Sequence, residues 1–537
     1  MATALELLRE GRRDEIWKKY CGYIDLSLEE FMDIQKRLLM EQIDLISKCE
    51  LGRKLMGDRA PTSVEEFRET VPLTTYEVYV PYLLERRDEA LPAKPYWWLH
   101  TSGRSGEYEH KWIPYSEEMA KKLAEYSIAG LIFASCSRKG EFVFEENDIM
   151  LAALAPFPYI SGAIGRALEW EFNFSFVPPM GEAEKMDFQE RIEKGFKLAL
   201  RTGLDAFDGV ASVLARIGDQ FVEGSGGFQP SLYLLHPKVL ARLIRGLIRS
   251  RLAGRKHLLP KDLWDVKCLG TGGTDTAMFR DRIKEHWGRE PVEAYACTEG
   301  GLISIQMWNC KGMTFFPDVC FLEFIPEDEH IKSKEDPTYR PRTSLLDEVE
   351  AGKRYEIVLT NLLGGALVRY RVGDIIQIIA LRDEELDVNL PQMLFYSRAD
   401  DIIDIASITR LTETIIWQAI ADADFAYTDW VARKEYQAGE VLLHLYIEPK
   451  GEVQANEIRE RIHRNLQRLD PFYAELESLW NMDPLCVTLL PPDTFRRYYL
   501  ARQREGADLA HLKPPHMNPS DRVLSMLLTT GSEEKAS

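Results

Sequence analysis

The sequence predicts an α/β protein. We expect a large N-terminal domain of helices with mixed and parallel sheets, including a β subdomain, and a small α+β C-terminal domain. The 537 residues exceed the usual size of a single hydrophobic core, so at least two domains are expected. In the middle of the chain, helical segments alternate with short strands, the pattern of parallel βαβ units. Beyond about Asp400 the order changes to strand, helix, strand, and we place the domains at residues 1–397 and 398–537.

The N-terminal section to about Met56 is predicted to be helical, because apolar residues recur at helical spacing from Leu28 to Leu38. The aromatic run YWWL at residues 96–99 predicts a short buried strand that ends in a loop of small residues. From Ser116 the helical pattern resumes.

In the middle block, residues 188–221 and 237–252 predict helices, while residues 266–269 and 292–296 predict strands. Each of these strands is followed by a loop of small polar residues. Loops at the carboxyl ends of parallel strands commonly bind ligands.

Between residues 315 and 379 the pattern changes to successive strands separated by turn residues, which predicts an antiparallel β subdomain. In the C-terminal domain, the strand segments VLLHLYIEP and LCVTLLPP flank a predicted helix at residues 455–469.

The composition indicates a globular protein with an acidic surface. Hydrophobic residues make up 45% and charged residues 28%, and 67 basic against 86 acidic residues give a net charge of -19. The electrostatic field of this negative net charge repels nucleic acid and anionic lipid, so we expect neither as a general partner. A phosphate-bearing ligand would need locally concentrated donors.

The sequence also bears on the cellular compartment. The N-terminal segment is charged throughout and shows no apolar stretch of a secretory signal. The long uncharged stretch between Asp148 and Arg166 is interrupted by prolines and predicts a buried segment or pocket wall, not a membrane span. The eight cysteines form no C-x-x-C pair and no zinc-spaced cluster with histidine. We therefore expect a cytoplasmic protein with reduced thiols.

The first candidate site is the loop TSGRSG at residues 101–106, which is followed by Lys111. Glycines let a backbone bend around an anion, hydroxyls and amides donate to phosphate oxygens, and a lysine adds positive charge. The spacing is neither that of a Walker loop nor that of a dinucleotide-binding loop. Taken alone, a polar turn without a ligand is an equal interpretation.

Two further loops follow predicted strands. The glycines of GTGGT at residues 270–274 suit the close approach of a planar ring such as adenine, or else form a tight strand-to-helix turn. In YACTEGG at residues 295–301, Glu299 has the chemistry to hold Mg²⁺ against phosphate oxygens and Tyr295 could stack on a base. The alternative is a glutamate in a surface turn.

The fourth loop is YRVGD at residues 370–374. The two carboxylate oxygens of Asp374 can accept hydrogen bonds from both hydroxyls of a ribose. A hairpin aspartate is the alternative, so each loop is inconclusive by itself.

In this order and at these separations, the loops resemble the signatures of the ANL adenylating superfamily. Within it, the sequence resembles the auxin-responsive acyl-acid amido synthetases, the Gretchen Hagen family. Its signatures are a Ser/Thr/Gly loop followed by Lys, a Tyr-x-Ser-Ser-Glu segment and Tyr-Arg-x-Gly-Asp, and their counterparts here are TSGRSG…K, YACTE and YRVGD. The resemblance covers nearly the whole chain and includes KWIPYS, FFPDVCFLEFIP, YEIVLTNLLGGALVRYRVGD and GADLAHLKPP.

The resemblance implies an AMP-forming ligase that uses ATP and Mg²⁺ to convert a carboxylic acid into its acyl-AMP. The acyl group would then pass to an amine, usually an amino acid in the family, to give an amide. The resemblance further implies an N-terminal adenylation domain and a mobile C-terminal lid that rotates near Asp400. A coenzyme A ligase that uses the same adenylate, and a non-catalytic nucleotide-binding homologue, remain alternatives.

The resemblance, together with the loop chemistry, assigns roles to individual residues. The catalytic residues would be Arg410, Lys513 and Glu299, and Glu299 would also hold the metal. The nucleotide-binding residues would be Ser102, Gly103, Ser105, Gly106, Lys111, Gly272, Gly273, Tyr295, Thr298, Asp374 and Arg398. Among these, Tyr295 would contact adenine, Thr298 the α-phosphate, and Asp374 and Arg398 the ribose.

Five positions depart from the family's pattern. Arg104 stands where the first loop usually has threonine, and Lys111 comes two residues later than in most relatives. Cys297 replaces a serine, Ser397 a glycine and His516 an arginine. None removes the implied Mg²⁺ or ribose ligand, and together they keep the non-catalytic alternative open.

The acyl pocket is the part that the sequence describes least. The helix at residues 116–132 and the segment at residues 156–164 are candidate walls by position and apolar content, and plain core is an equal interpretation. The sequence assigns neither the acid nor the oligomeric state.

Overall fold

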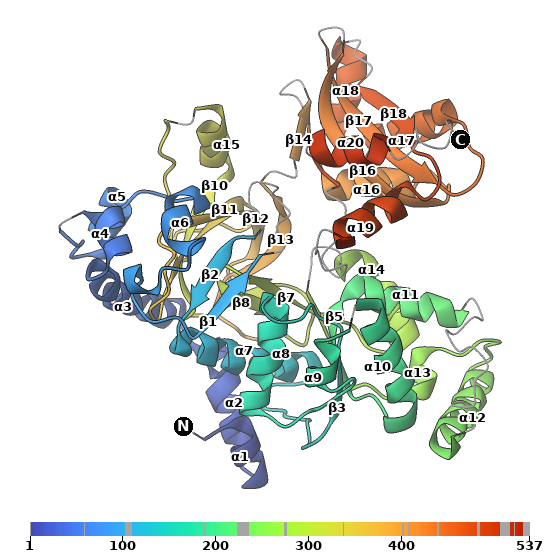
Figure 1. The fold of residues 1–537 in the computed structure, drawn as a ribbon, viewed down its shortest axis with the longest axis horizontal. Coiled ribbons are helices and arrows are strands. Elements are labelled where there is room, and N and C mark those ends of the chain that lie inside the picture. The colour runs from blue at the N-terminus through green and yellow to red at the C-terminus, as the bar shows by residue number, and fades with distance from the viewer. Residues whose placement is uncertain are drawn as a thin grey trace. The chain divides into compact units, whose positions relative to one another are not determined.

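The computed structural model describes most of the chain. The described residues are 2–57, 59–101, 110–186, 188–222, 236–272, 276–336, 338–399, 402–405, 409–437, 440–480, 484–504, 516–519 and 521–529. They divide into two compact units (Figure 1). The first unit comprises the described residues of 2–101, 110–372 and 376–396, and the second those of 373–375 and from 397 onward.

The first unit begins with a run of helices, as the sequence predicts. The segment expected from Leu28 becomes the 20-residue helix α3, whose N-terminus is closed by a reciprocal pair of hydrogen bonds between Ser27 and Glu30. Buried Phe31, Leu39 and Ile43 lie on one face of it. The helices of this region are α1 (Ala4–Arg9), α2 (Arg13–Cys21), η1 (Gly22–Asp25), α3 (Leu28–Ser47), α4 (Glu50–Met56), α5 (Val64–Thr70), α6 (Tyr76–Leu83) and η2 (Asp88–Ala90).

A two-stranded sheet then brackets the first candidate loop. The predicted aromatic strand is β1 (Trp97–His100), which pairs antiparallel with β2 (Trp112–Tyr115). His100 lies opposite Trp112, so the pairing brings together the two ends of residues 102–109. The predicted helix after Ser116 is α7 (Glu117–Ser135), and the Ser116 hydroxyl caps its first turn.

One 11-stranded sheet forms the centre of the first unit, in the order β10-β11-β12-β13-β9-β8-β7-β6-β5-β3-β4. Its strands are β3 (Ile149–Ala152), β4 (Ser175–Phe176), β5 (Ala206–Val210), β6 (Cys268–Gly272), β7 (Val292–Cys297), β8 (Gly301–Gln306), β9 (Met313–Phe315), β10 (Cys320–Pro326), β11 (Arg354–Asn361), β12 (Tyr370–Ala380) and β13 (Gln392–Arg398). From β4 to β7 the pairs are parallel, which confirms the predicted βαβ pattern. From β7 through β8 and β9 to β13 they are antiparallel.

The structure refines two expectations. The strands predicted between residues 315 and 379 are present, but they extend the central sheet because Gln392 of β13 pairs with Thr314 of β9. The segment predicted as helical at residues 188–221 holds two helices with β5 between them. The buried run from Ala206 to Phe207 is short and apolar, a pattern that a strand and a helix share.

Helices flank the parallel part of the sheet. They are α8 (Ile160–Glu171), α9 (Met180–Ala183), α10 (Phe188–Thr202), α11 (Ala211–Val222), α12 (Pro237–Leu252), α13 (Pro260–Leu263) and α14 (Thr276–Trp287). Helix α15 (Glu327–Glu335) instead contacts the antiparallel strands β10 and β11. The bounds of α12 agree with the prediction. A core of Leu151, Phe207, Leu269, Trp264 and Trp287 joins these helices to the strands.

The second unit is a small α+β fold, and the predicted strand-helix-strand order is confirmed. Its sheet has the order β16-β17-β18, with β17 and β18 parallel and β16 antiparallel to β17. Its elements are β14 (Ile402–Ile405), β15 (Thr409–Thr412), α16 (Glu413–Ala421), β16 (Tyr427–Gln437), β17 (Glu440–Pro449), α17 (Ala455–Leu469), α18 (Pro471–Trp480), β18 (Leu485–Leu489), α19 (Thr494–Arg504) and α20 (Asp521–Thr529).

The uncharged stretch between Asp148 and Arg166 folds as β3, a loop and the first part of α8. No helix within the described ranges has the length and apolar content needed to cross a membrane.

His516, which stands where relatives carry arginine, sits in a buried charged cluster of the second unit. Its Nδ1 lies 2.5 Å from Glu413 Oε1, its Nε2 lies 2.8 Å from Asp429 Oδ1, and its ring stacks on Trp430. Burial alone would lower the pKa of His516, but the hydrogen bonds to Asp429 and Glu413 outweigh it and raise the pKa to about 9. The imidazolium therefore keeps its positive charge at physiological pH.

This cluster makes the stability of the second unit depend on pH. The pKa of His516 in the folded protein lies above its ordinary value of 6.5. Its contribution to the free energy of unfolding is therefore complete below pH 6.5 and is lost as the pH rises through about 9. We expect His516→Gln to weaken the hydrogen-exchange protection of β16 and β17 at pH 6.5, by on the order of 3 kcal/mol. The difference from wild type should shrink toward pH 9.5. A difference that stays constant over this range would contradict the assignment.

Candidate active site

Glu299 lies at the tip of a tight turn between two neighbouring strands. β7 ends at Cys297, β8 begins at Gly301, and these two residues pair across the turn. Gly301 has a φ of +75°, a left-handed conformation that favours glycine. The half-buried Glu299 is thus presented at the edge where the parallel strands end, where ligands commonly bind.

Three buried side chains from other parts of the chain hold the backbone of this turn. Tyr115 Oη donates to the Thr298 carbonyl at 2.9 Å, and Asn361 Nδ2 donates to the Glu299 carbonyl at 2.8 Å. Cys320 Sγ lies 3.5 Å from the Gly300 carbonyl. Three consecutive carbonyls therefore each have a donor side chain that is at most 1% exposed. The turn that carries Glu299 is fixed before any ligand arrives.

Close packing adds to this constraint at Gly300. A Cβ at this position would lie 2.7 Å from Ile303 Cδ1 and 2.8 Å from Leu359 Cδ2. The turn therefore has no room for a side chain here, and glycine lets it lie against the sheet.

Asn361 connects the Glu299 turn to the strand that carries Asp374. Its Oδ1 accepts a hydrogen bond from the main-chain amide of Leu367 at 3.0 Å, and the main-chain amide of Asn361 donates to the Leu367 carbonyl at 2.8 Å. These bonds close the loop between β11 and β12. Gln42 of α3 bonds to both Gly364 and Gly365 of the same loop.

Two buried tyrosines lie close to the Glu299 turn. Burial, followed by the charges at Glu299 and Cys297, raises the pKa of Tyr370 well above its ordinary value. Burial and the neighbouring Cys297, Cys320 and Glu299 likewise raise the pKa of Tyr115. Both phenols therefore stay protonated over the physiological pH range, and Tyr115 remains a hydrogen-bond donor to the turn.

Lys111 lies at the downstream end of the first loop. The Thr101 amide donates to the Lys111 carbonyl at 3.0 Å, and the Lys111 amide donates to Thr101 Oγ1 at 3.2 Å. Its Nζ lies 5.6 Å from the centre of the Tyr76 ring. Lys111 directly precedes β2, whose Tyr115 donates to the Thr298 carbonyl of the turn.

Two histidines flank the first loop, and neither was singled out from the sequence. The rings of His100 and His110 are stacked with their centres 4.1 Å apart. The Nδ1 atom of each lies 3.0 Å from the Thr101 carbonyl, so both imidazoles can donate to one acceptor. Burial and the neighbouring His110 lower the pKa of His100, which favours the neutral ring. The pair joins the two ends of residues 102–109.

Asp374 lies on β12, directly after Gly373, whose φ is +80°. Asp374 is 5% exposed. The neighbouring Arg371 forms two hydrogen bonds to buried Glu356, at 2.9 and 2.6 Å. Burial opposes ionisation of Glu356, yet hydrogen bonds from His330 and Arg371 lower its pKa. The arginine of the YRVGD motif thus serves the packing of β12 against β11.

Two other predicted ligands have clear surroundings. Tyr295 is buried, and its ring centre lies 6.2 Å from that of Phe395 on β13. Gly272 ends β6, and a Cβ built on it would meet no atom of the described residues within 4 Å. The space above Gly272 is therefore open, as close approach of a ligand requires.

Several predicted site residues cannot be placed. The described residues exclude Ser102, Gly103, Ser105, Gly106, Gly273 and Lys513. The backbones of Arg398 and Arg410 belong to β13 and β15, but their side chains are outside the description. Their predicted roles stay predictions.

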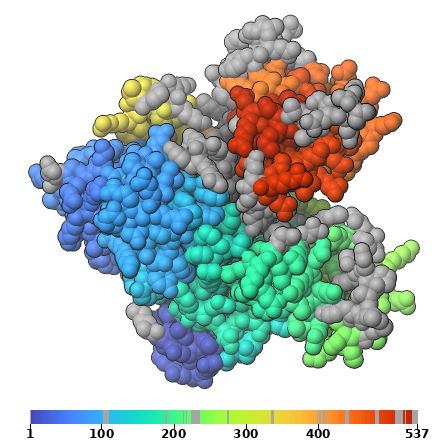
Figure 2. Space-filling model, viewed as in Figure 1, coloured from blue at the N-terminus to red at the C-terminus, as the bar shows by residue number. Residues whose placement is uncertain are grey.

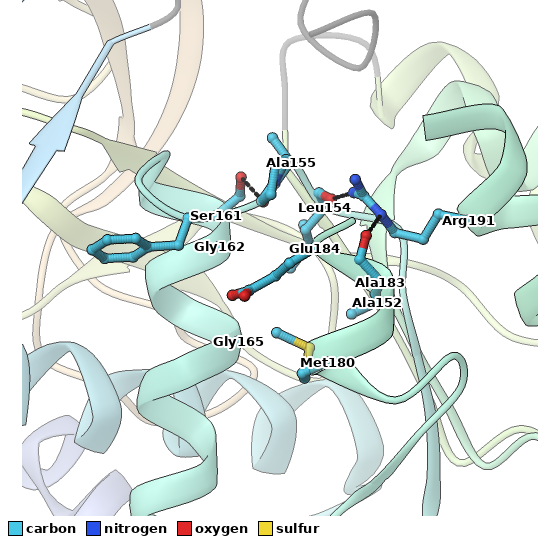
Figure 3. A pocket seen from close by; sticks show the side chains of 12 residues that line it. Ala152, Leu154, Ala155, Ser161, Gly162, Gly165, Met180, Ala183, Glu184 and Arg191 are labelled. Carbon is cyan, nitrogen blue, oxygen red and sulfur yellow. Dashed lines mark hydrogen bonds between the residues drawn. The ribbon is translucent and has the colours of Figure 1, made fainter. Parts of the chain in front are cut away.

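A small cavity lies beside the predicted acyl-pocket segment (Figure 3). Its volume is about 20 Å³, room for roughly one water molecule. Arg191, which is 2% exposed, borders it and donates to the carbonyls of Leu154, Ala183 and Met186. The lining residues are Ala152, Leu154, Ala155, Pro156, Phe157, Ser161, Gly162, Gly165, Met180, Ala183, Glu184 and Arg191, with none from α7.

Comparison with known families matches two parts of the chain. Residues 22–152 match the GH3 family N-terminal domain, and residues 313–398 match the GH3 family central domain. The chain contains the N-terminal and central domains of the GH3 family. The resemblance seen in the sequence is thereby confirmed.

Curated relatives share modest identity with this chain. A GH3 domain-containing protein of Mus musculus is 23% identical over 378 residues, 67% of this chain and 65% of the mouse protein. The indole-3-acetic acid-amido synthetase GH3.3 of Arabidopsis thaliana is 35% identical over 110 residues, 20% of this chain and 16% of that enzyme. The matched regions thus span less than two thirds of the length of these relatives.

Solved structures confirm the fold. The AtGH3.15 acyl acid amido synthetase in complex with 2,4-DB aligns with a TM-score of 0.66 at 16% identity, over 93% of both chains. A 2-hydroxyisobutyryl-CoA ligase in its postadenylation state aligns with a TM-score of 0.57 at 14% identity, over 98% of this chain and 93% of the ligase. At these identities the likeness shows the α/β fold shared by GH3 and related adenylating enzymes, and nothing more.

The two GH3 matches lie on either side of the Glu299 turn in the sequence. Tyr115 belongs to the N-terminal match, and Asn361 and Cys320 belong to the central match. Residues 153–312, which contain Glu299, fall outside both. The structure brings both matched regions to the Glu299 turn, because all three side chains that donate to its carbonyls lie in those regions.

No role for Tyr115 or Asn361 was predicted from the sequence. Both lie in blocks that carry the family resemblance, KWIPYS and YEIVLTNLLGG, and that is the signal that could have found them. Their role depends on contacts over 183 and 62 residues of separation, which no local pattern reveals.

Asn361 gives the most direct test of this arrangement. Asn361→Ala leaves the Glu299 carbonyl and the Leu367 amide without their buried partners. We expect it to lower the free energy of unfolding of the first unit by about 2–4 kcal/mol. Denaturant unfolding measures this loss, with Asn173→Ala as a control at an exposed asparagine. Equal costs for the two variants would contradict the proposed role.

Proposed function

We propose that this chain is an AMP-forming acyl-acid amido synthetase. It would use ATP to activate a carboxylic acid as its acyl-AMP and then pass the acyl group to an amine, an amino acid being the expected class. The observation that carries the proposal is the fixed Glu299 turn, held by side chains of both GH3 domains. The names of the curated amido synthetases support the same reaction.

The turn suits a magnesium ion that is shared with a nucleotide. Within the described ranges, no group of three or more His, Cys, Asp or Glu side chains could enclose a metal. Mg²⁺ commonly binds through one or two carboxylates together with substrate phosphates and water, so a single fixed carboxylate is a fitting donor set. In this proposal Glu299 holds the ion, which when bound neutralises phosphate charge.

The protein's contribution to the first step would be position and charge. A carboxylate oxygen of the acid would attack the α-phosphate of ATP, and pyrophosphate would leave. Attacking and leaving groups are both anionic, so a fixed geometry with cationic side chains favours the reaction. Lys111 would supply one cation near the turn, with Arg410 and Lys513 as further candidates.

Other predicted residues would bind the nucleotide. Asp374 and Arg398 would hold the ribose, Gly272 and Tyr295 would border the adenine, and Thr298 would face the α-phosphate. The second unit would act as a lid between adenylation and transfer, and such movements can limit turnover. We further propose that the protein works in the cytoplasm, with a small-molecule carboxylic acid and an amine or amino acid as its substrates.

Pyrophosphate release with a panel of carboxylic acids tests the function. The proposal expects release that depends on one class of acid, and an amide product when amino acids are added. A thioester formed from coenzyme A in place of the amide would identify a coenzyme A ligase. Bound ATP without release for any acid would instead identify a non-catalytic homologue.

Glu299 should be essential for adenylation. We expect Glu299→Ala to reduce acid-dependent pyrophosphate release by about 100-fold or more while leaving the fold unchanged, since one carboxylate would carry the metal. Circular dichroism checks the fold, and Glu385→Ala at an exposed glutamate is the matched control. Near wild-type release from Glu299→Ala would refute the metal assignment.

Asp374 should discriminate the sugar of the nucleotide. Wild type is expected to use 2′-deoxy-ATP roughly 10-fold less efficiently than ATP, because one hydrogen bond to a charged group is lost. Asp374→Ala should lose efficiency with ATP and no longer distinguish the two nucleotides. Measuring kcat/KM for both nucleotides in both proteins gives the answer. A variant that kept the full preference for ATP would show that Asp374 does not contact the ribose.

A further inference from the structure

Helix α12 (Pro237–Leu252) exposes a stripe of large apolar side chains. Figure 1 shows the helix at the outer edge of the first unit, and in Figure 2 light-green atoms of this region project at the right edge. The exposed side chains are Leu240, Ile244, Leu247, Ile248 and Leu252, which are between 45% and 83% exposed. At 100° per residue these positions fall on one side of the helix.

The opposite side of α12 is packed against the protein. Val239, Gly246 and Ser250 are buried, and a Cβ on Gly246 would lie 2.6 Å from Leu263 Cδ2 of α13. Arg242 Nη1 donates to the carbonyls of Ala199 and Leu200 at the end of α10. The helix is therefore fixed in place, and its exposed stripe is a constant part of the surface.

The charge of α12 is opposite to that of the chain as a whole. It contains Lys238, Arg242, Arg245, Arg249 and Arg251 and no acidic residue, in a protein with a net charge of -19. Arg245 and Arg249 share Asp265, whereas Lys238 and Arg251 have no acidic partner among the described residues. Basic side chains thus border an exposed apolar stripe, a combination typical of helices that lie on anionic membranes.

The charge and packing of α12 disfavour two other kinds of occupant. A second copy of the chain placed face to face would oppose two basic surfaces, which repel each other. A partner that wraps around a basic amphipathic helix needs access to all sides, and the side with Val239 and Gly246 is packed. A planar anionic surface needs one side only.

We propose that α12 attaches this protein to the surface of an anionic phospholipid bilayer. The apolar stripe, about 18 Å long from Leu240 to Leu252 at 1.5 Å per residue, lies at the level of the acyl chains. Lys238, Arg251 and the other flanking cations contact the headgroups. We expect the rest of the acidic surface to repel anionic lipid, as the net charge of -19 implies. Screening limits that repulsion to about 8 Å at physiological ionic strength.

Vesicle cosedimentation of the full chain tests this proposal. Wild type should bind phosphatidylcholine vesicles that contain about one third phosphatidylserine at least 10-fold better than pure phosphatidylcholine vesicles, and added salt should weaken the binding. The double variant Leu247→Glu and Ile248→Glu should lose at least 10-fold of this binding. Both side chains are exposed, so the fold should be retained, and circular dichroism checks this.

A second double variant controls for charge. Leu84→Glu and Leu381→Glu adds the same two negative charges at exposed leucines of the first unit outside α12, and it should bind like wild type. Equal loss in both double variants, or no preference for phosphatidylserine in wild type, would overturn the proposal. A concentration-dependent dimer that only the α12 variant abolishes would also overturn it and identify a second copy as the occupant.

Discussion

The candidate site depends on the hydrogen bonds that three buried side chains make to consecutive carbonyls of one turn. Tyr115, Asn361 and Cys320 meet the carbonyls of residues 298–300, so the backbone that carries Glu299 cannot rearrange without leaving buried polar groups unpaired. The cost of fixing the turn is met by folding rather than by ligand binding. The backbone that carries the Glu299 carboxylate is thus pre-organised, as charge stabilisation by a fixed group requires.

The same contacts explain how separate parts of the chain act on one place. The two GH3 domain matches lie on either side of a segment that matches neither, and the turn lies in that segment. Asn361 also closes the loop that leads into β12 and Asp374. Through these bonds one asparagine holds both the turn with the predicted metal ligand and the loop that leads into β12. The central sheet is what brings their strands together.

The sequence predicted the α/β class, the parallel strands, α12 and the small C-terminal fold, because periodicity and turn residues are local signals. It did not predict that the strands after residue 315 join the parallel sheet, since strand pairing depends on distant residues such as Thr314 and Gln392. It identified Glu299 and Asp374 from their motifs. It gave no role to Tyr115, Asn361 or the His100–His110 pair, whose positions are defined only by tertiary contacts. The surface role of α12 likewise needed exposed fractions, because buried and exposed apolar residues look alike in a sequence.

The central claim is that the three donors position Glu299 for its work on a magnesium nucleotide. The Mg²⁺ dependence of acyl-adenylate formation in Tyr115→Phe tests it most directly, because this change removes one hydroxyl that reaches Glu299 only through the turn. The account predicts that the Mg²⁺ concentration for half-maximal rate rises by about 3-fold or more, roughly the worth of one neutral hydrogen bond, and that high Mg²⁺ restores most of the rate. A Mg²⁺ dependence identical to that of wild type would contradict it.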